Sequence, residues 1–238
     1  MNASTKGLEV HMLPQPDDNT CGPTSLHAVY NYHNLELSLK EVIKGIDRVG
    51  NGGTLAVYLG VDALKRGFDA TIYTFNLRMF DPTWFVLSSE QIRDKIRARL
   101  KHKRIKKLKD MGDAYMEFLA LGGEIRMEDL TTALIQSFLD EGNPILTGLS
   151  ATYLYHSQRE YADDQGASVY DDLKGEPMGH FVVLMGRSDN GDILVADPYK
   201  GNPISSNNYY KVAPTRLIHS ILLGIVTYDA NLLIISPK

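Results

Sequence analysis

Apolar and polar positions in the first 142 residues alternate mainly at helical spacing. Leu26, Val29 and Tyr30, for example, would share one buried face of a helix over 21–33. Serine capping boxes, apolar residues three or four apart and a glycine after the last turn predict further helices. These helices open at Ser38, follow Thr54, and cover 88–109, 110–121 and 128–140, and two short strands, 8–13 and 70–74, interrupt the series.

After Pro144 the pattern changes to short apolar runs that are typical of strands. These runs cover 144–155, 179–187, 192–197, 209–212 and 232–236, with Asn190-Gly191 as a two-residue hairpin turn and a short helix near 214–222. The polar segment 156–177 is expected to leave the sheet. Helices followed by an antiparallel sheet predict an α+β fold. We expect a single domain over 1–238, with a helical part at about 1–142 and a β-rich part at about 143–238.

Composition narrows the class of protein. The chain has 238 residues, of which 43% are hydrophobic, enough for one sizeable core. A single cysteine makes no internal disulfide, and no paired cysteines are present to hold zinc, so we expect no metal and no cofactor. No run approaches the roughly 20 apolar residues of a membrane span, and the first residues do not resemble a signal peptide. We therefore expect a cytoplasmic protein without a membrane partner.

Charge is distributed unevenly along the chain. The formal net charge is -4, which disfavours nucleic acid as a partner. The segment from Arg93 to Lys109 nevertheless holds ten Lys or Arg residues and one acid, Asp94. Such a segment, within a basic helical region at about 88–121, is most often a solvated outer face. The alternative is a wall that attracts an acidic peptide through residues such as Arg97, Lys101 and Arg104.

Cys21, the only cysteine, lies where a turn passes into a predicted helix. Backbone N–H groups and the helix dipole at that point favour the thiolate, which is the nucleophilic form of cysteine. A free cysteine is more often a small buried apolar residue. Gln15, six positions upstream across a turn, can bring a side-chain amide beside the cysteine and donate to an oxyanion. Gly22 leaves room for an approaching substrate.

His180 and Asp197 supply a base and a carboxylate from the β-rich part. Among the seven histidines, His180 alone begins a predicted strand after a glycine, Gly179. Asp197 ends a strand before a proline and can hold the imidazole in one tautomer. The two-residue hairpin would, however, place Asp197 opposite Leu184, about 13 Å along the strand from His180 at ~3.3 Å per residue. A bulge, a twist or a bend must close that gap.

Three local sequences together resemble one family. They are QPDDNTCGP at 15–23, GHFVVLMG at 179–186 and VADPY at 195–199. The order Gln, Cys, His, Asp and the local contexts resemble the bacteriocin-processing, double-glycine leader peptidases and their free-standing relatives, which are papain-like cysteine peptidases. The resemblance implies a nucleophile helix packed on a C-terminal antiparallel sheet. It also implies Cys21 as nucleophile, His180 as general base and acid, Asp197 as the orienting group, and Gln15 in the oxyanion hole.

The chain departs from the transporter-linked members, which are fused to membrane and ATP-binding domains. Its segment 81–123 is also longer than a minimal domain of this family needs. Because of these departures, the substrate choice of the family is not carried over to this chain. We predict a cysteine peptidase or amidohydrolase that acts on a peptide, acidic if the basic segment takes part, through a thioester. Predicted substrate contacts are Gly22 and Gly179 in addition to the basic residues. A non-catalytic module that binds leader peptides and a cysteine-dependent acyltransferase stay open as alternatives.

Overall fold

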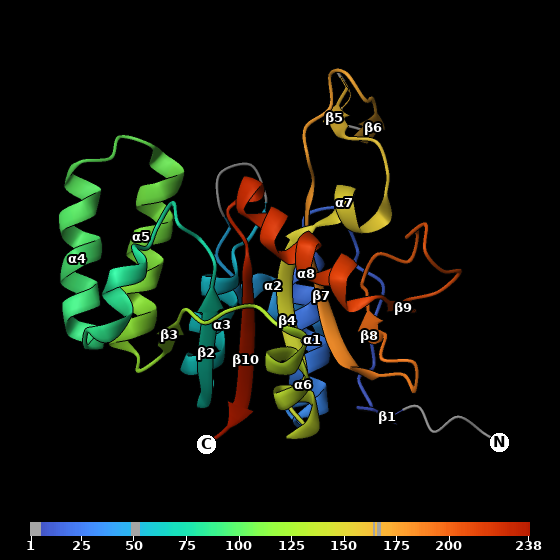
Figure 1. Ribbon diagram of the computed structural model, residues 1–238, viewed down its shortest axis with the longest axis horizontal. Coiled ribbons are helices and arrows are strands. Elements are labelled where there is room, and N and C mark those ends of the chain that lie inside the picture. The colour runs from blue at the N-terminus through green and yellow to red at the C-terminus, as the bar shows by residue number, and fades with distance from the viewer. Residues whose placement is uncertain (1–5, 49–52, 164, 166–167) are drawn as a thin grey trace.

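In the computed structural model, which describes residues 6–48, 53–163, 165 and 168–238, an eight-stranded sheet crosses the molecule and helices pack on both of its faces (Figure 1). Its strands follow the order β3-β2-β10-β4-β7-β8-β9, and β1 pairs with β7. All pairings are antiparallel except that between β2 and β3. The strands, including the separate pair β5 and β6, are β1 (Lys6–Gly7), β2 (Phe68–Thr74), β3 (Glu124–Arg126), β4 (Ile145–Ser150), β5 (Glu160–Ala162), β6 (Ser168–Tyr170), β7 (Gly179–Arg187), β8 (Ile193–Ala196), β9 (Tyr209–Val212) and β10 (Asn231–Pro237).

The helices confirm the α+β prediction and several of its boundaries. The predicted capping boxes at Ser38 and Ser88 are both formed. No helix within the described ranges is long and apolar enough to span a membrane. The helices are α1 (Cys21–Tyr32), α2 (Leu39–Gly45), α3 (Ala56–Lys65), α4 (Ser89–Lys101), α5 (Lys106–Ala120), α6 (Thr132–Asp140), α7 (Ala151–Tyr155) and α8 (Pro214–Leu223), with 3-10 turns η1 (Pro82–Val86) and η2 (Gly224–Thr227).

Two hydrophobic cores lie on the two faces of the sheet. Successive residues of β7 point to opposite faces, so Phe181 and Val183 join the core beneath α1, α3 and α5, whereas Val182 and Leu184 join the core beneath α6 and α8. Because β7 is covered on both sides, its apolar run is almost continuous. Gly179 and His180 therefore lie at the start of an inner strand that is largely buried.

The predicted long helix over 88–109 is wrong. α4 ends at Lys101, and α5 begins at Lys106 and runs back beside it as a hairpin (Figure 1). The apolar stripe of α4 is buried only when a second helix covers it, and Gly112 of α5 allows that approach. A Cβ at Gly112 would come within 2.8 Å of the Leu100 side chain. Ile105, within the range predicted as one helix, is instead 54% exposed in the connection between α4 and α5.

Two smaller predictions also need correction, and a third is confirmed. The strand predicted over 8–13 is absent, because this run is fixed to the sheet edge by isolated hydrogen bonds, such as that from the Leu8 N–H to the Met185 carbonyl. The run 144–155 is a strand only to Ser150 and then forms α7. The segment 156–177 does leave the sheet, as the projecting pair β5 and β6 (Figure 1); residues 164, 166 and 167 of it lie outside the described residues.

A buried polar contact fixes α1 against α3. The Tyr30 hydroxyl, with 0% of the side chain exposed, donates to Asp62 Oδ2 at 2.6 Å, and Arg66 Nε donates to the same oxygen at 2.6 Å. We expect Tyr30→Phe to lower the free energy of unfolding by about 1.5–3 kcal/mol, because a mostly buried carboxylate loses a donor. Urea denaturation measures this loss.

Tyr32→Phe on the same helix is the matched control. Tyr32 donates to a neutral acceptor, the Gly142 carbonyl, at 2.7 Å, so its loss should cost about 1 kcal/mol. Equal costs for the two variants would contradict the role assigned to the Asp62 carboxylate.

Candidate active site

Cys21 is the first residue of α1, and a tightly hydrogen-bonded turn leads into it. The carbonyl of Asp17 accepts from both the N–H and the hydroxyl of Thr20, while the Asp17 carboxylate accepts from the N–H of Asn19. Thr20 is the N-cap residue, but its side chain does not cap the helix. The N–H groups of Cys21 and Gly22 belong to the first turn, where a helix leaves its donors without intrahelical partners. The half-buried thiol thus lies beside the backbone N–H groups of this first turn.

His180 and Asp197 form a hydrogen-bonded pair. The His180 Nε2 donates to Asp197 Oδ1 at 2.8 Å, and the two side chains are 8% and 0% exposed. Burial lowers the pKa of His180, but the Asp197 carboxylate and the nearby Cys21 side chain raise that pKa to about 10. Cys21 therefore lies close enough to act on the pKa of His180, and Nδ1 is the ring nitrogen that does not face Asp197. The fold brings together the three residues predicted as a triad.

The Asp197 carboxylate accepts four hydrogen bonds. Oδ1 accepts from His180 and from the Tyr199 N–H at 2.8 Å, and Oδ2 accepts from the hydroxyls of Tyr155 and Tyr210 at 2.7 Å each. Burial raises the pKa of Asp197, but His180 and the two hydroxyls outweigh it and hold that pKa below its usual value. Burial and the nearby carboxylate raise the pKa of both tyrosines. This carboxylate stays ionised in a buried site because it is fully hydrogen-bonded.

Tyr155 and Tyr210 were not identified from the sequence. Tyr155 ends α7 and Tyr210 lies within β9, so neither is close in sequence to a motif that carries chemistry. The one available signal was indirect: a buried carboxylate needs donors, and tyrosine hydroxyls at the ends of neighbouring elements can supply them.

Two irregularities close the predicted 13 Å gap between Asp197 and His180. The hairpin turn has three residues instead of two, since the Ser188 N–H donates to the Asp192 carbonyl and Gly191 takes a φ of +85°. A β-bulge between Leu184 and Gly186 then shifts the register once more. Val183 pairs with Ala196, so Asp197 lies one position further on, opposite residue 182 and two positions from His180. The separation along the strand falls to about 6.6 Å.

Gln15 lies near this pair, although its amide is engaged locally. The Gln15 N–H donates to the carbonyl of Pro198, the residue after Asp197, at 2.9 Å. Its Nε2 donates to the Asp17 carbonyl at 3.0 Å. An amide nitrogen carries two hydrogens, so one N–H of Gln15 is still available to a ligand. The position of Gln15 beside the start of α1 is consistent with the predicted role in an oxyanion hole, which stays a prediction.

The two glycines predicted to contact substrate differ in surroundings. Gly22 is buried, and a Cβ there would lie 2.5 Å from the Thr54 methyl and 3.2 Å from the Phe181 ring. The missing side chain therefore serves the packing of α1 on β7, which is a different reason from room for a substrate. Gly179 is exposed beside His180, and a Cβ there would lie 2.6 Å from the Thr227 hydroxyl.

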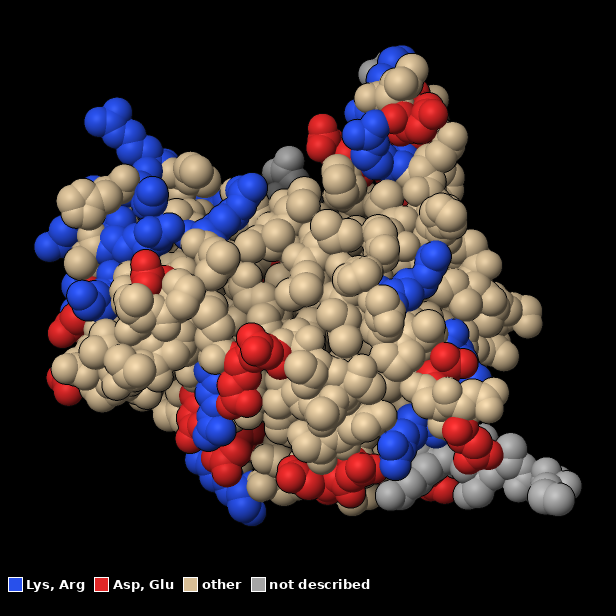
Figure 2. Space-filling view, viewed as in Figure 1, with Lys and Arg blue, Asp and Glu red and all other residues tan. Residues whose placement is uncertain are grey.

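The predicted basic contacts lie further away. Arg97, Lys101 and Arg104 belong to the α4–α5 hairpin, at the edge of the molecule in Figure 1, whereas α1 and β7 lie at its centre. Figure 2 shows Lys and Arg side chains gathered over this hairpin. Lys107 of the same hairpin lies nearer to the candidate site. Its Nζ donates to the carbonyl of Thr227 at 3.4 Å, and Thr227 lies against Gly179.

Comparison with known proteins finds one matching family model and several solved structures to which the chain is similar. The model of the Peptidase_C39 like family matches residues 7–216. No curated protein matches the chain in sequence. One similar solved structure is a double glycine motif protease from an AMS/PCAT transporter in complex with the leader peptide, at 14% identity and a TM-score of 0.46, covering 99% of this chain and 97% of that one. Another is the peptidase domain of Streptococcus ComA, a bi-functional ABC transporter, at 13% identity and a TM-score of 0.45, covering 97% and 100%.

The buried pair should make stability depend on pH. The raised pKa of His180 stabilises the fold fully below its unfolded value of 6.5, and this contribution is lost as the pH rises through about 10. The lowered pKa of Asp197 stabilises the fold above 3.8 and is lost on acidification. We expect the difference in unfolding free energy between the wild type and His180→Gln to be largest between about pH 4 and 6.5 and to shrink by pH 10. Urea denaturation over this range measures it, and a constant difference would contradict the pairing.

Proposed function

The chain belongs to the Peptidase_C39 like family, and from that premise we propose that it is a cysteine peptidase that hydrolyses a peptide or amide bond. Cys21 is the proposed nucleophile, His180 the general base and acid, and Asp197 the group that orients the imidazole. The observation that carries this proposal is the His180 imidazole, which donates to a buried carboxylate at 2.8 Å and whose pKa responds to Cys21 at the start of α1.

In the proposed acylation step, the Cys21 thiolate attacks the carbonyl carbon of the scissile bond. A carbon–sulfur bond forms, and the carbonyl oxygen becomes an oxyanion. The Cys21 N–H at the start of α1 and the Gln15 amide are the proposed donors to that oxyanion. The intermediate then collapses to a thioester as the carbon–nitrogen bond breaks. With a pKa of about 10, His180 is protonated near neutral pH and can deliver its Nδ1 proton to the leaving amine.

In the proposed deacylation step, the roles reverse. Neutral His180 takes a proton from a water molecule, and the resulting hydroxide attacks the thioester carbon. The carbon–sulfur bond breaks, the carboxylic acid leaves, and the imidazolium and thiolate are restored. The hydrogen bond that Nε2 donates to Asp197 keeps Nε2 protonated throughout, so that Nδ1 is the nitrogen that exchanges protons with sulfur, amine and water.

Substitutions at the triad test the proposal with a library of fluorogenic peptides. We expect Cys21→Ala to abolish hydrolysis, because no nucleophile is left. Asp197→Asn should lower kcat by about 10²- to 10⁴-fold, because the amide no longer fixes the productive tautomer. Asp189→Asn, on the exposed turn of the same hairpin, is the matched control and should keep wild-type rates. Hydrolysis that survives Cys21→Ala would remove Cys21 from the mechanism.

Two further measurements separate the alternatives. Stoichiometric alkylation of Cys21 by iodoacetamide at neutral pH, faster than that of free cysteine, is expected of a nucleophile and not of a non-catalytic binding module. Analysis of products in the presence of an added amine distinguishes a hydrolase, which releases a carboxylic acid, from an acyltransferase, which releases a new amide.

We also propose that the substrate is acidic and that the α4–α5 hairpin attracts it. The support is the cluster of ten basic residues between Arg93 and Lys109, together with the contact of Lys107 with Thr227 beside Gly179. Attraction of this kind acts over a Debye length, about 10 Å at 0.1 M salt, so it raises the rate of encounter without a contact at the scissile bond.

Charge reversal tests this second proposal. We expect the triple variant Arg97→Glu, Lys101→Glu, Arg104→Glu to lower the ratio of kcat/KM for acidic over neutral peptides several-fold and to flatten its dependence on salt. Lys40→Glu, Lys44→Glu on exposed positions of α2 is the matched control. If the triple variant keeps the wild-type salt dependence, the hairpin is only a solvated face.

A further inference from the structure

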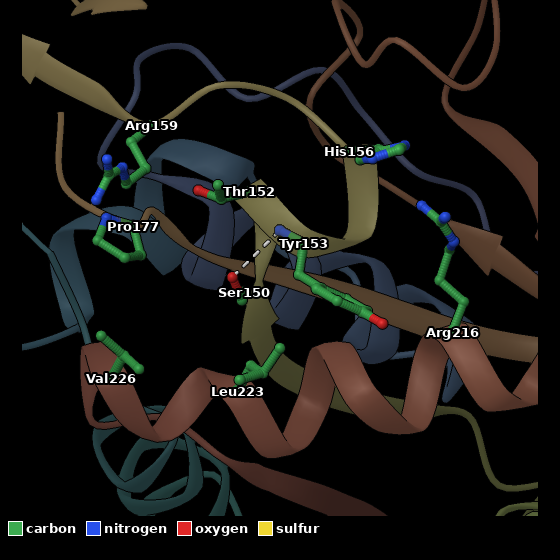
Figure 3. A pocket seen from close by; sticks show the side chains of 9 residues that line it. All are labelled: Ser150, Thr152, Tyr153, His156, Arg159, Pro177, Arg216, Leu223 and Val226. Atoms are coloured by element: carbon green, nitrogen blue, oxygen red, sulfur yellow. Dashed lines mark hydrogen bonds between the residues drawn. The ribbon is translucent and has the colours of Figure 1, made fainter. Parts of the chain in front are cut away.

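A pocket of about 360 Å³ opens between α7, α8 and η2, beneath the root of the projecting β5–β6 segment (Figure 3). None of the residues predicted from the sequence to act on substrate lines it. The pocket lies on the sheet face that carries α8. It is large enough for one or two amino-acid side chains.

The pocket shares its walls with the candidate active site. Ser150, in its lining, pairs across the sheet with Gly179, the neighbour of His180. Thr152, also in the lining, accepts a hydrogen bond from the Met178 N–H at 2.9 Å. Neighbouring strands are about 4.8 Å apart, so a peptide bound at His180 can place a nearby side chain in this pocket.

The floor of the pocket is apolar and unusually open to solvent. Tyr153, Leu223 and Val226 are 42%, 41% and 48% exposed, and Pro177 lies beside them (Figure 3). Apolar side chains scattered singly over a surface need no explanation, but a contiguous group inside a hollow commonly marks a binding site. The floor can cover the methylene groups of a ligand.

The rim of the pocket is cationic. Arg159 and Arg216 lie on opposite sides of it in Figure 3, with His156 near Arg216. Arg216 is held in place by neutral groups, since its Nη1 donates to the Leu154 carbonyl at 3.2 Å and its guanidinium lies 6.0 Å from the centre of the Tyr153 ring.

Arg159 is the more compensated cation, because it donates to the carbonyl of Asp172 and its charge acts on Asp171. Over the described ranges, neither arginine forms an ion pair and no Asp or Glu lines the pocket. A fixed guanidinium above an apolar floor is suited to a carboxylate on a short aliphatic stem.

We propose that this pocket is a specificity subsite that binds a carboxylate of the peptide substrate, with Arg216 as the residue that pairs with it. The inference rests on the proposed peptidase function and assigns the choice of substrate to residues other than the basic hairpin. The carboxylate belongs either to a Glu or Asp side chain near the scissile bond or to a free C-terminus.

The test uses the full chain and pairs of fluorogenic peptides that differ only by Glu or Gln at one position around the scissile bond. We expect the wild type to prefer Glu at one position several-fold, since only the Glu peptide can form an ion pair with the Arg216 guanidinium. Arg216→Gln should reduce this ratio to about 1. A second set of peptides with free or amidated C-termini shows which kind of carboxylate is recognised.

Two variants keep the outcome clear if Arg216→Gln disturbs α7. Arg216→Lys keeps the positive charge and should retain part of the preference, whereas Arg216→Glu should favour Lys over Glu at the same position. Lys211→Gln, an exposed cation on β9, should leave the ratio at its wild-type value. An unchanged ratio in Arg216→Gln, or no preference at any position in the wild type, would overturn the proposal.

Binding separates this inference from the proposed catalysis. Fluorescence anisotropy measures the affinity of labelled Glu and Gln peptides for Cys21→Ala, which cannot turn them over. A preference for Glu that disappears in Cys21→Ala, Arg216→Gln supports the subsite even if the wild type hydrolyses no peptide. Equal affinities for the two peptides would reject the subsite even if hydrolysis is confirmed.

Discussion

A buried carboxylate with every lone pair engaged organises the centre of this protein. Asp197 is 0% exposed, and an isolated carboxylate in such a place would cost several kcal/mol. The four donors that offset this cost come from β7, α7, β9 and the turn after β8. Each donor fixes the element that carries it. The carboxylate that orients the proposed catalytic imidazole therefore also holds together the end of the sheet on which that imidazole lies.

The register of the β7–β8 hairpin decides whether this carboxylate can reach His180. A two-residue turn would place Asp197 opposite residue 184, on the same face as His180 but four positions away. The three-residue turn alone would place it opposite residue 183, on the other face, because successive side chains of a strand alternate. The bulge adds one more shift, so that Asp197 stands opposite residue 182, on the correct face and two positions away. Neither irregularity suffices without the other.

The register of this hairpin illustrates why local boundaries could be predicted from the sequence and contacts between distant segments could not. Boundaries set by local signals were predicted well: Cys21 begins α1, Gly179 begins β7, and both capping boxes are formed. The hairpin register, the break between α4 and α5 and the tyrosines around Asp197 depend on contacts between distant segments. The break between α4 and α5 is the clearest case. The charge and apolar spacing of 88–109 suit one long helix, and the sequence alone does not show that α5 packs against the apolar face of α4.

The short helix α7 joins the candidate catalytic site to the pocket beside it. Five residues are too few for a helix to be stable on its own, so α7 depends on its contacts. Tyr155 donates to Asp197 on one side, whereas Tyr153, two residues earlier and about 200° around the helix axis at 100° per residue, lines the pocket on the other. Arg216 donates a hydrogen bond to the carbonyl of Leu154, the residue between these two tyrosines. The same turn of helix thus positions the Asp197 carboxylate and the cationic rim, and it fixes the distance between the pocket and the His180 imidazole.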